Sequence, residues 1–286
     1  MTLWLNTVLA TVVVSSAPVE RDSTDFVGDG VFYATIEGPA MDPAGNLYAV
    51  NLGSEGTVGK VSRDGKAQLY LSLPQGSIGN GIRFDAKGQM FIADYTGHNI
   101  WRYDGKQLRL HSHDPRMFQP NDLTIADNGV IFASDPDWVN RQGQFWRIGL
   151  NGQAQLMETG MGTTNGIEIS PDQTRLYINE SAQRRVWVYD LDKELNPGNK
   201  RLLIEFDDFG LDGMRCDQEG NLLIARYGKG TVAKVSPQGE LLREYRLKGE
   251  FPTNVTFDSQ NPDVLYVTLQ KRGAVELLYL TDGAAK

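Results

Sequence analysis

The sequence predicts an all-β protein, a six-bladed β-propeller with four-stranded blades. Two observations carry this prediction: one short pattern occurs six times, and its copies are spaced 41–47 residues apart. Each copy begins with a polar residue, continues as a short strand, turns, and ends in a more apolar strand. A period in the forties with several short strands per unit is typical of propeller blades. Six copies therefore predict six blades.

The clearest copy covers residues 165–179, in which residues 170–173 (Ser-Pro-Asp-Gln) have the composition of a tight turn. Proline presets φ for a turn, and aspartate can fold its side chain back onto the local backbone. We call the first polar residue of each copy its head residue. The six head residues are Glu37, Asn80, Asn121, Asn165, Asp212 and Asn254.

The last repeat lacks an outer strand. Its strands are expected at residues 255–257, 264–269 and 274–280, and no fourth follows. Residues 26–35 read as a strand that belongs to no complete repeat. We therefore expect this N-terminal strand to complete the sixth blade, which would close the ring and leave no open sheet edge at the seam.

Composition allows one large domain, expected over residues 26–286. The 286-residue chain is 40% apolar, and the repeat fills it without a linker. The net charge of −8, with Lys and Arg scattered, argues against a nucleic-acid partner. We expect a monomer or weak homo-oligomer that acts on a small molecule.

Residues 1–17 differ from the rest of the chain. They are mostly apolar from Leu3 to Val14 and then offer Ser15, Ser16 and Ala17, the small residues that a signal peptidase prefers. The stretch is shorter than the about 20 residues that an ordinary bilayer span requires, so no transmembrane helix is expected in the mature protein. We expect export; a disordered or wrongly assigned start would instead leave the protein in the cytoplasm.

The head residues form a candidate metal site. The innermost strands of a propeller lie side by side around its axis, so these six residues should face the axis at one depth. Each has a side-chain oxygen, and none is Lys, Arg, His or Cys. Two carboxylates among amides suit one hard divalent cation, above all Ca²⁺, which takes 6–8 oxygen ligands. Mg²⁺ and Mn²⁺ are alternatives; Zn²⁺ is less natural because its usual imidazole and thiolate ligands are missing.

Four motifs follow one another along the chain: Glu-Gly-Pro (37–39), Pro-Asn-Asp (120–122) with Ser-Asp-Pro (134–136), Asn-Gly-Ile (165–167) with Ser-Pro-Asp (170–172), and Asp-Gly (212–213). Together they resemble the regucalcin-like senescence-marker protein/gluconolactonase/luciferin-regenerating enzyme family, and the likeness extends from residue 26 onward. The resemblance implies one catalytic divalent metal bound by Glu37, Asn165 and Asp212, with Asn121 close to metal or substrate. Family members commonly hydrolyse sugar lactones, and more distant relatives cleave phosphotriesters.

The expected substrate pocket departs from that family in one place. Some sugar-lactone members have a substrate-contacting Arg two residues before the second-motif Asn, where this chain has Gln119. Residues 135–143 read as a long loop on the same face, a candidate lid that contains Trp138. The ends of the second strands complete a polar rim suited to a hydroxylated molecule: Asn51, Asp94, Tyr95, Asp135, Asn179, Glu180, Arg226 and Tyr227. As substrate contacts we select Asn121, Gln119, Asp135, Trp138 and Arg226.

These observations predict a metal-dependent hydrolase of a lactone or similar cyclic ester. The metal would act as a Lewis acid, Asp212 as the general base, and Glu37 and Asn165 as ligands. Two alternatives remain: a non-catalytic propeller that binds a small molecule or protein around a structural metal, and a phosphotriesterase with the same metal. Paired carboxylates favour an enzyme, because closing a ring requires no charge at its axis.

Overall fold

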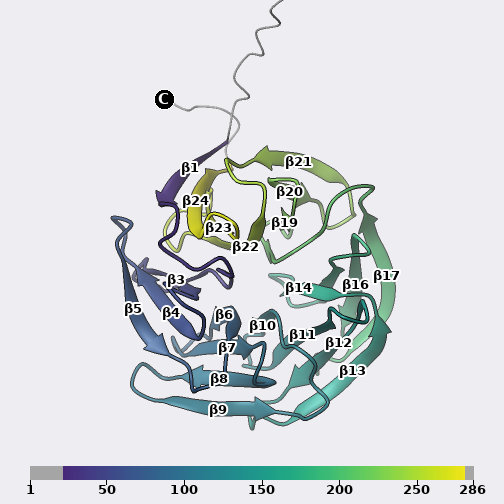
Figure 1. Ribbon diagram of the computed structural model, residues 1–286. Coiled ribbons are helices and arrows are strands. Elements are labelled where there is room, and N and C mark those ends of the chain that lie inside the picture. Colours follow the sequence, from purple (N-terminus) through teal and green to yellow (C-terminus); the bar gives the residue numbers. More distant parts are fainter. Residues whose placement is uncertain (1–21, 281–286) are drawn as a thin grey trace, which may run out of the picture.

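The computed structural model describes residues 22–280, which form six four-stranded antiparallel sheets arranged as blades around a common axis (Figure 1). The predicted six-bladed propeller is confirmed. No helix within these residues is long and apolar enough to cross a membrane. The expected signal segment, residues 1–17, lies outside the described residues.

The strands of blades 1 to 3 follow one another outward from the axis. Blade 1 contains β2 (Ala40–Met41), β3 (Leu47–Val50), β4 (Thr57–Val61) and β5 (Ala67–Ser72). Blade 2 contains β6 (Gly79–Phe84), β7 (Met90–Asp94), β8 (Asn99–Tyr103) and β9 (Leu108–His113). Blade 3 contains β10 (Leu123–Ile125), β11 (Ile131–Asp137), β12 (Gln142–Ile148) and β13 (Ala154–Met161).

Blades 4 and 5 repeat this order, and blade 6 borrows its outer strand. Blade 4 contains β14 (Thr164–Ile169), β15 (Arg175–Glu180), β16 (Arg185–Leu191) and β17 (Pro197–Glu205). Blade 5 contains β18 (Met214–Cys216), β19 (Leu222–Arg226), β20 (Thr231–Val235) and β21 (Leu241–Arg246). Blade 6 contains β22 (Pro252–Phe257), β23 (Val264–Leu269), β24 (Ala274–Tyr279) and β1 (Ser23–Val27).

The core lies between neighbouring blades. Every residue of the second strands β7, β19 and β23 is buried, whereas most of the outer strand β17 is exposed. A strand covered on both faces needs a continuous apolar run, which explains why the second strands are the most apolar segments of each repeat. One such cluster packs Phe132 and Phe145 of blade 3 against Ile178 of blade 4.

The N-terminal strand closes the ring, as expected, but it begins earlier in the chain. β1 pairs antiparallel with β24, with Ser23 opposite Leu278 and Val27 opposite Val275, and the two strands lie side by side in Figure 1. Of the predicted strand 26–35, only Phe26 and Val27 belong to β1, and of these two only Val27 is paired with β24. Gly28 and Gly30 end the strand, because glycine readily leaves the extended conformation, as the φ of +73° at Gly30 shows.

Charged side chains reinforce this closure. The Arg272 guanidinium lies 2.8 Å from Asp25 and 2.6 Å from Asp29, and it also pairs with the buried Glu276. Glu276 in turn accepts a 2.6 Å hydrogen bond from Ser23. Both the backbone ladder and this ionic cluster therefore hold the first strand against the last.

The expected lid is a hairpin rather than a long loop. β11 continues to Asp137 and β12 starts at Gln142, with these two residues paired across the strands. The Asp137 carboxylate closes the turn by accepting bonds from the Asn140 backbone N–H (3.0 Å) and side-chain Nδ2 (2.6 Å). The hydrogen bonds of Asp137 thus stabilise a short turn, where the amino-acid composition had predicted a longer loop.

Candidate active site at the centre of the ring

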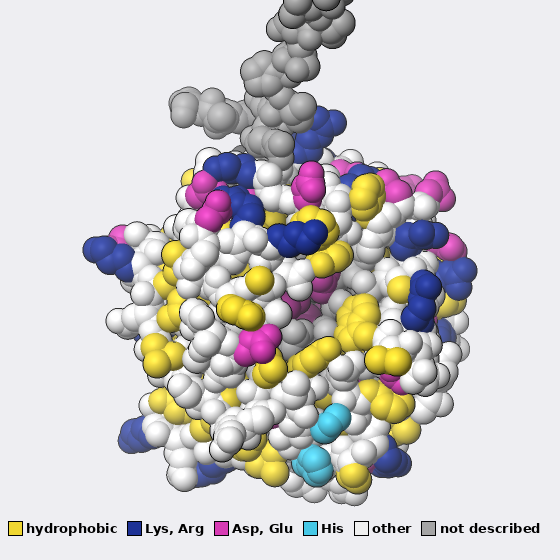
Figure 2. Space-filling model, viewed as in Figure 1, with side chains coloured by type: hydrophobic (Ala, Val, Ile, Leu, Met, Phe, Trp, Pro, Cys, Tyr) yellow, Lys and Arg dark blue, Asp and Glu magenta, His cyan; other side chains and the backbone are white. Residues whose placement is uncertain are grey.

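A cavity of about 480 Å³ opens on the propeller axis. Figure 2 shows it as a hollow with acidic side chains at its base and apolar side chains around its rim. Five of the six head residues line it: Glu37, Asn80, Asn121, Asn165 and Asp212. Trp138 also lines it, and so do Tyr95 and Tyr227 from the ends of second strands. This size suits a small molecule.

The backbone sets the head residues at the inner end of each blade. Asn165 lies within β14, and Asp212 stands just before β18, where its N–H donates to the carbonyl of Ala225 (2.9 Å). The glycine that follows Asp212 lets the neighbouring inner strand approach closely. A Cβ atom built on Gly213 would lie 1.8 Å from Asn254 Cγ, so only glycine fits there.

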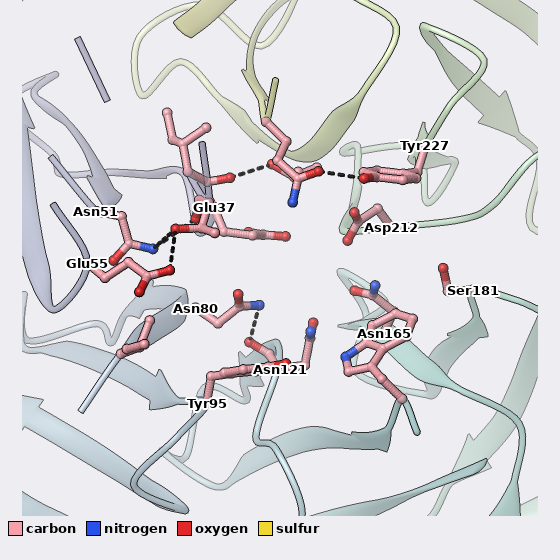
Figure 3. Close-up of a pocket in the computed structure, with 16 residues that line it drawn as sticks. Glu37, Asn51, Glu55, Asn80, Tyr95, Asn121, Asn165, Ser181, Asp212 and Tyr227 are labelled. Atoms are coloured by element: carbon pink, nitrogen blue, oxygen red, sulfur yellow. Dashed lines mark hydrogen bonds between the residues drawn. The ribbon is translucent and has the colours of Figure 1, made fainter. Parts of the chain in front are cut away.

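Three buried oxygens of the cavity have no hydrogen-bond partner. They are Glu37 Oε1, Asn121 Oδ1 and Asn165 Oδ1. In Figure 3 these side chains and Asp212 surround the same space. A buried acceptor without a partner costs about 1–3 kcal/mol, so three of them at one place require an explanation. Carboxylate and amide oxygens are the donors that a hard divalent cation takes, and this donor set fits one.

Burial and nearby negative charge disfavour the ionised forms of Glu37 and Asp212. Burial raises the pKa of Glu37 to about 7, and the nearby Asp122 charge adds to the effect; bonds from Gly38 and Asn254 oppose it. Burial also raises the pKa of Asp212, and the charge of Glu37 adds to that shift. A divalent cation would supply the positive charge that both groups lack. Within residues 22–280 no three His, Cys, Asp or Glu side chains gather as a metal cluster, so amides must complete any such site.

A second polar layer lies against the head residues that line the cavity, and it was not predicted from the sequence. We call it the buried ion network; it consists of Arg83, Asp122, Glu168 and Arg215. Asp122 pairs with Arg83 at 3.0 Å and with Arg215 at 3.5 Å, and Arg83 also reaches Glu168 at 3.3 Å. Burial and the charge of Arg83 lower the pKa of Arg215 to about 10. A signal was present, since three of the four residues stand three positions after a head residue.

Asn254, the sixth head residue, connects the two layers instead of lining the cavity. Its Nδ2 donates to Glu37 Oε2 (3.1 Å) and to Asp122 Oδ2 (3.2 Å). Its Oδ1 accepts from Arg215 (3.1 Å). Its side-chain oxygen and nitrogen are thus both bonded, and Asn254 supports the orientation of Glu37.

Two residues that we expected to contact substrate lie elsewhere. Asp135 is fully buried and accepts hydrogen bonds from the backbone N–H of Phe118 (2.9 Å) and Gln119 (2.6 Å) and from the Trp146 indole (2.7 Å). It anchors the segment that leads to Asn121. Arg226 is also fully buried, and its guanidinium pairs with Asp208 (2.6 Å) and Glu244 (2.7 Å). Neither side chain is among those that line the cavity, so their contact with a substrate stays a prediction.

Gln119 and Trp138 are joined by a hydrogen bond at the edge of the site. Trp138 lines the cavity, but Gln119 does not. The Gln119 side-chain oxygen accepts from the Trp138 backbone N–H at 3.4 Å, so it supports the hairpin turn. The cavity is also lined by Glu55, from the turn between β3 and β4, which was not among the site residues predicted from the sequence.

Fold and site together define a six-bladed propeller with an oxygen-lined pocket on its axis. The family described as "SMP-30/Gluconolactonase/LRE-like region" matches residues 35–271, and the chain belongs to this family. The resemblance found in the sequence motifs is therefore confirmed.

Known proteins agree with this assignment. The gluconolactonase of Zymomonas mobilis is 28% identical over 244 residues, covering 72% of this chain and 68% of that protein. The 6-deoxy-6-sulfogluconolactonase of Pseudomonas putida is 32% identical over 228 residues, covering 75% and 76%. The crystal structure of regucalcin, a calcium-binding protein from Agrobacterium tumefaciens, has a TM-score of 0.75 at 22% identity, covering 88% of this chain and 93% of that one.

Proposed function

We propose that the protein hydrolyses lactones of small hydroxylated molecules with the help of one divalent cation, preferably Ca²⁺. The observation that carries this proposal is the set of three partnerless buried oxygens beside Asp212, open to a cavity of about 480 Å³. Relatives at 28% and 32% identity that are named as sugar lactonases support the substrate class.

Glu37, Asn165 and Asp212 would hold the cation, and Asn121 would orient the substrate or complete the coordination. A bound divalent cation supplies Lewis acidity, which polarises a carbonyl and stabilises the oxyanion that forms on it. Ca²⁺ suits an all-oxygen donor set with amides; Mg²⁺, Mn²⁺ and Zn²⁺ are the alternatives to test.

Asp212 is the proposed general base. Its carboxylate takes a proton from the water that attacks the lactone carbonyl, the ring C–O bond breaks, and the departing alkoxide oxygen receives a proton. Its place on the cavity wall favours this role, because a general base must lie within reach of the attacking water. The amides of Asn80 and Asn121 can meet substrate hydroxyls.

Aromatic side chains complete the pocket. Tyr95, Trp138 and Tyr227 come from three different blades and line the same cavity. Their flat apolar faces suit the C–H face of a sugar ring. The Tyr95 hydroxyl can bond to its oxygens, whereas the Tyr227 hydroxyl donates to Gln270 and can accept from a substrate hydroxyl. This mixture favours a hydroxylated cyclic molecule over an extended peptide.

The test is a lactone-hydrolysis screen of purified protein, first treated with a chelator and then supplied with Ca²⁺, Mg²⁺, Mn²⁺ or Zn²⁺. Hydrolysis that disappears with the chelator and returns with one metal supports the proposal. The rival function is a non-catalytic binding propeller with a structural metal. It becomes the better one if the metal-loaded protein turns over neither lactones nor phosphotriesters.

A further inference from the structure

Glu55 is the one carboxylate of the cavity that the proposed metal site does not use. The cavity is lined by three acidic residues, Glu37, Glu55 and Asp212, and among the described residues that line it there is no Lys, Arg or His. Figure 3 shows Glu55 on the opposite side of the space from Asp212 and Asn165. It therefore faces a different part of any bound molecule.

One hydrogen bond, itself supported by others, contacts the carboxylate of the exposed Glu55. The buried Asn51 donates from Nδ2 to the Thr35 carbonyl (2.8 Å) and to Thr35 Oγ1 (3.2 Å). The Thr35 hydroxyl then donates to Glu55 Oε1 (3.2 Å). A hydroxyl has one proton, and because Thr35 already accepts from Asn51, that proton is directed at Glu55. The other carboxylate oxygen remains available to a ligand.

The turn that carries Glu55 is also closed by its own bonds. Asn51 Oδ1 accepts from the Gly56 N–H (3.2 Å), and Thr57 Oγ1 donates to the carbonyls of Leu52 (2.9 Å) and Ser54 (2.8 Å). Gly56 adopts a φ of +77°, which a side chain would strain. The position of Glu55 is thus set by the fold of the turn.

The charges around the site leave Glu55 uncompensated. A divalent cation would offset Glu37 and Asp212. The guanidinium groups nearest the axis, Arg83 and Arg215, belong to the buried ion network and already face Asp122. A substrate with a negative group on the Glu55 side would therefore meet a like charge and no cation.

We propose that Glu55 is a specificity-determining residue: it accepts a hydrogen bond from a substrate hydroxyl and excludes lactones that carry a phosphate, sulfonate or carboxylate group. The lactone part of this statement rests on the proposed function, whereas the charge selection does not. Like charges near a water-exposed mouth reduce binding by about tenfold, which sets the expected size of the preference.

The experiment compares uncharged and anionic forms of one skeleton on the Ca²⁺-loaded full chain. Binding of sorbitol and sorbitol 6-phosphate is measured by calorimetry, and hydrolysis of gluconolactone and its 6-phosphate ester is measured as kcat/KM. The variants are Glu55→Gln, Glu55→Lys and, as a matched charge control, Glu194→Lys. Glu194 is exposed in the turn between β16 and β17 and does not line the cavity.

We expect the unmutated protein to favour the uncharged form about tenfold in both measurements. Glu55→Gln should remove most of that preference and Glu55→Lys should reverse it, while Glu194→Lys leaves it unchanged. An equal preference in the unmutated protein and Glu55→Lys, an equal effect of Glu194→Lys, or no binding of either polyol overturns the inference. A Glu55-dependent polyol preference without any lactone hydrolysis supports charge selection and refutes the proposed function instead.

Discussion

Two polar layers lie on the axis of this propeller, and they differ in how their groups are paired. The mouth layer, formed by Glu37, Asn121, Asn165 and Asp212, leaves three buried oxygens without a partner. In the buried ion network each carboxylate faces at least one guanidinium within 3.5 Å. Both layers come from the inner strands or from the residues just before them.

The two layers have different roles: the buried ion network supports the fold, and the mouth layer is suited to bind a ligand. The attraction within a buried ion pair can offset the cost of desolvating it when the geometry is good and further hydrogen bonds satisfy the remaining atoms. Buried acceptors without donors remain unfavourable until a ligand arrives, so the protein holds them in place at a cost. The unpaired layer is thus the place to expect a ligand, and the paired layer is the scaffold beneath it.

The largest effect is expected from Asp212→Asn in the mouth layer. The amide retains an oxygen of similar size but cannot take a proton, so kcat at saturating metal should fall by about 10²–10⁴-fold. Steady-state lactone hydrolysis at several Ca²⁺ concentrations measures this and separates lost metal binding from lost chemistry. Asn80→Ala changes a head residue that lines the same cavity but lies outside the proposed ligand set, so it is the control and should cost much less. Near-normal hydrolysis by Asp212→Asn would show that another group is the base.

Disrupting the buried ion network should instead lower the free energy of unfolding. Asp122→Ala leaves Arg83 and Arg215 without their shared carboxylate, and loss of one partner of a buried pair typically costs about 3–5 kcal/mol. Urea denaturation of metal-free protein measures the free energy of unfolding. Asn121→Ala, one residue away, removes a partnerless oxygen and should cost less than about 1 kcal/mol. Equal losses in the two variants would contradict the distinction between the layers.

The metal-free mouth layer should make stability fall as pH rises. Glu37 has a pKa of about 7 in the folded protein against 4.5 for an unperturbed glutamate, so the folded state binds its proton more tightly. Its contribution is complete below pH 4.5 and is lost by about pH 7; the raised pKa of Asp212 acts in the same direction. At about 1.4 kcal/mol per pKa unit, the loss is about 3 kcal/mol.

Urea denaturation at several pH values in the presence of a chelator measures this slope. Glu37→Gln has no proton to lose at this position and should flatten it. Saturating Ca²⁺ should flatten it too, because the cation favours both carboxylates. A stability that rises steadily between pH 5 and pH 7 in the chelated protein would contradict the prediction.

The smallest effect is the stabilisation by metal itself. Ca²⁺ at 100 times its dissociation constant should add about 2.7 kcal/mol to the free energy of unfolding, seen as a higher Tm. Asn165→Ala removes one proposed ligand and should reduce this gain. Glu194→Lys changes a remote exposed charge and should retain it. No Tm change with any of the four divalent metals would remove the reason to treat the mouth layer as a metal site.

The sequence predicted the blades well because the signal for them is local and repeated six times. The strand at residues 26–35 was misplaced because Gly28 and Gly30 carry a turn signal that the apolar pattern around them obscured. Asp135 and Arg226, which do not line the cavity, were selected by their place at the ends of second strands. Their spacing predicts the end of the blade that they reach, but not whether the side chain turns toward the axis or between blades.

The buried ion network was not predicted because its pairs join different blades. Arg83 and Asp122 come from neighbouring repeats, and only the closed ring brings them to 3.0 Å. Glu55 was missed because its approach to the cavity depends on positive φ angles within a short turn. Glu37, Asn121, Asn165 and Asp212 could be selected because they occupy one register of the repeat.

The pairing of β1 with β24 also constrains when the ring can close during synthesis of the chain. The first strand of the propeller leaves the ribosome before its partner has been made, since Val27 pairs with Val275. At about 5–20 residues per second, translation leaves β1 waiting on the order of 10–50 s. The polar residues Ser23 and Asp25 make the unpaired strand less apolar, which disfavours aggregation during that interval. The ring can therefore be completed only once β24 has been made and has paired with β1.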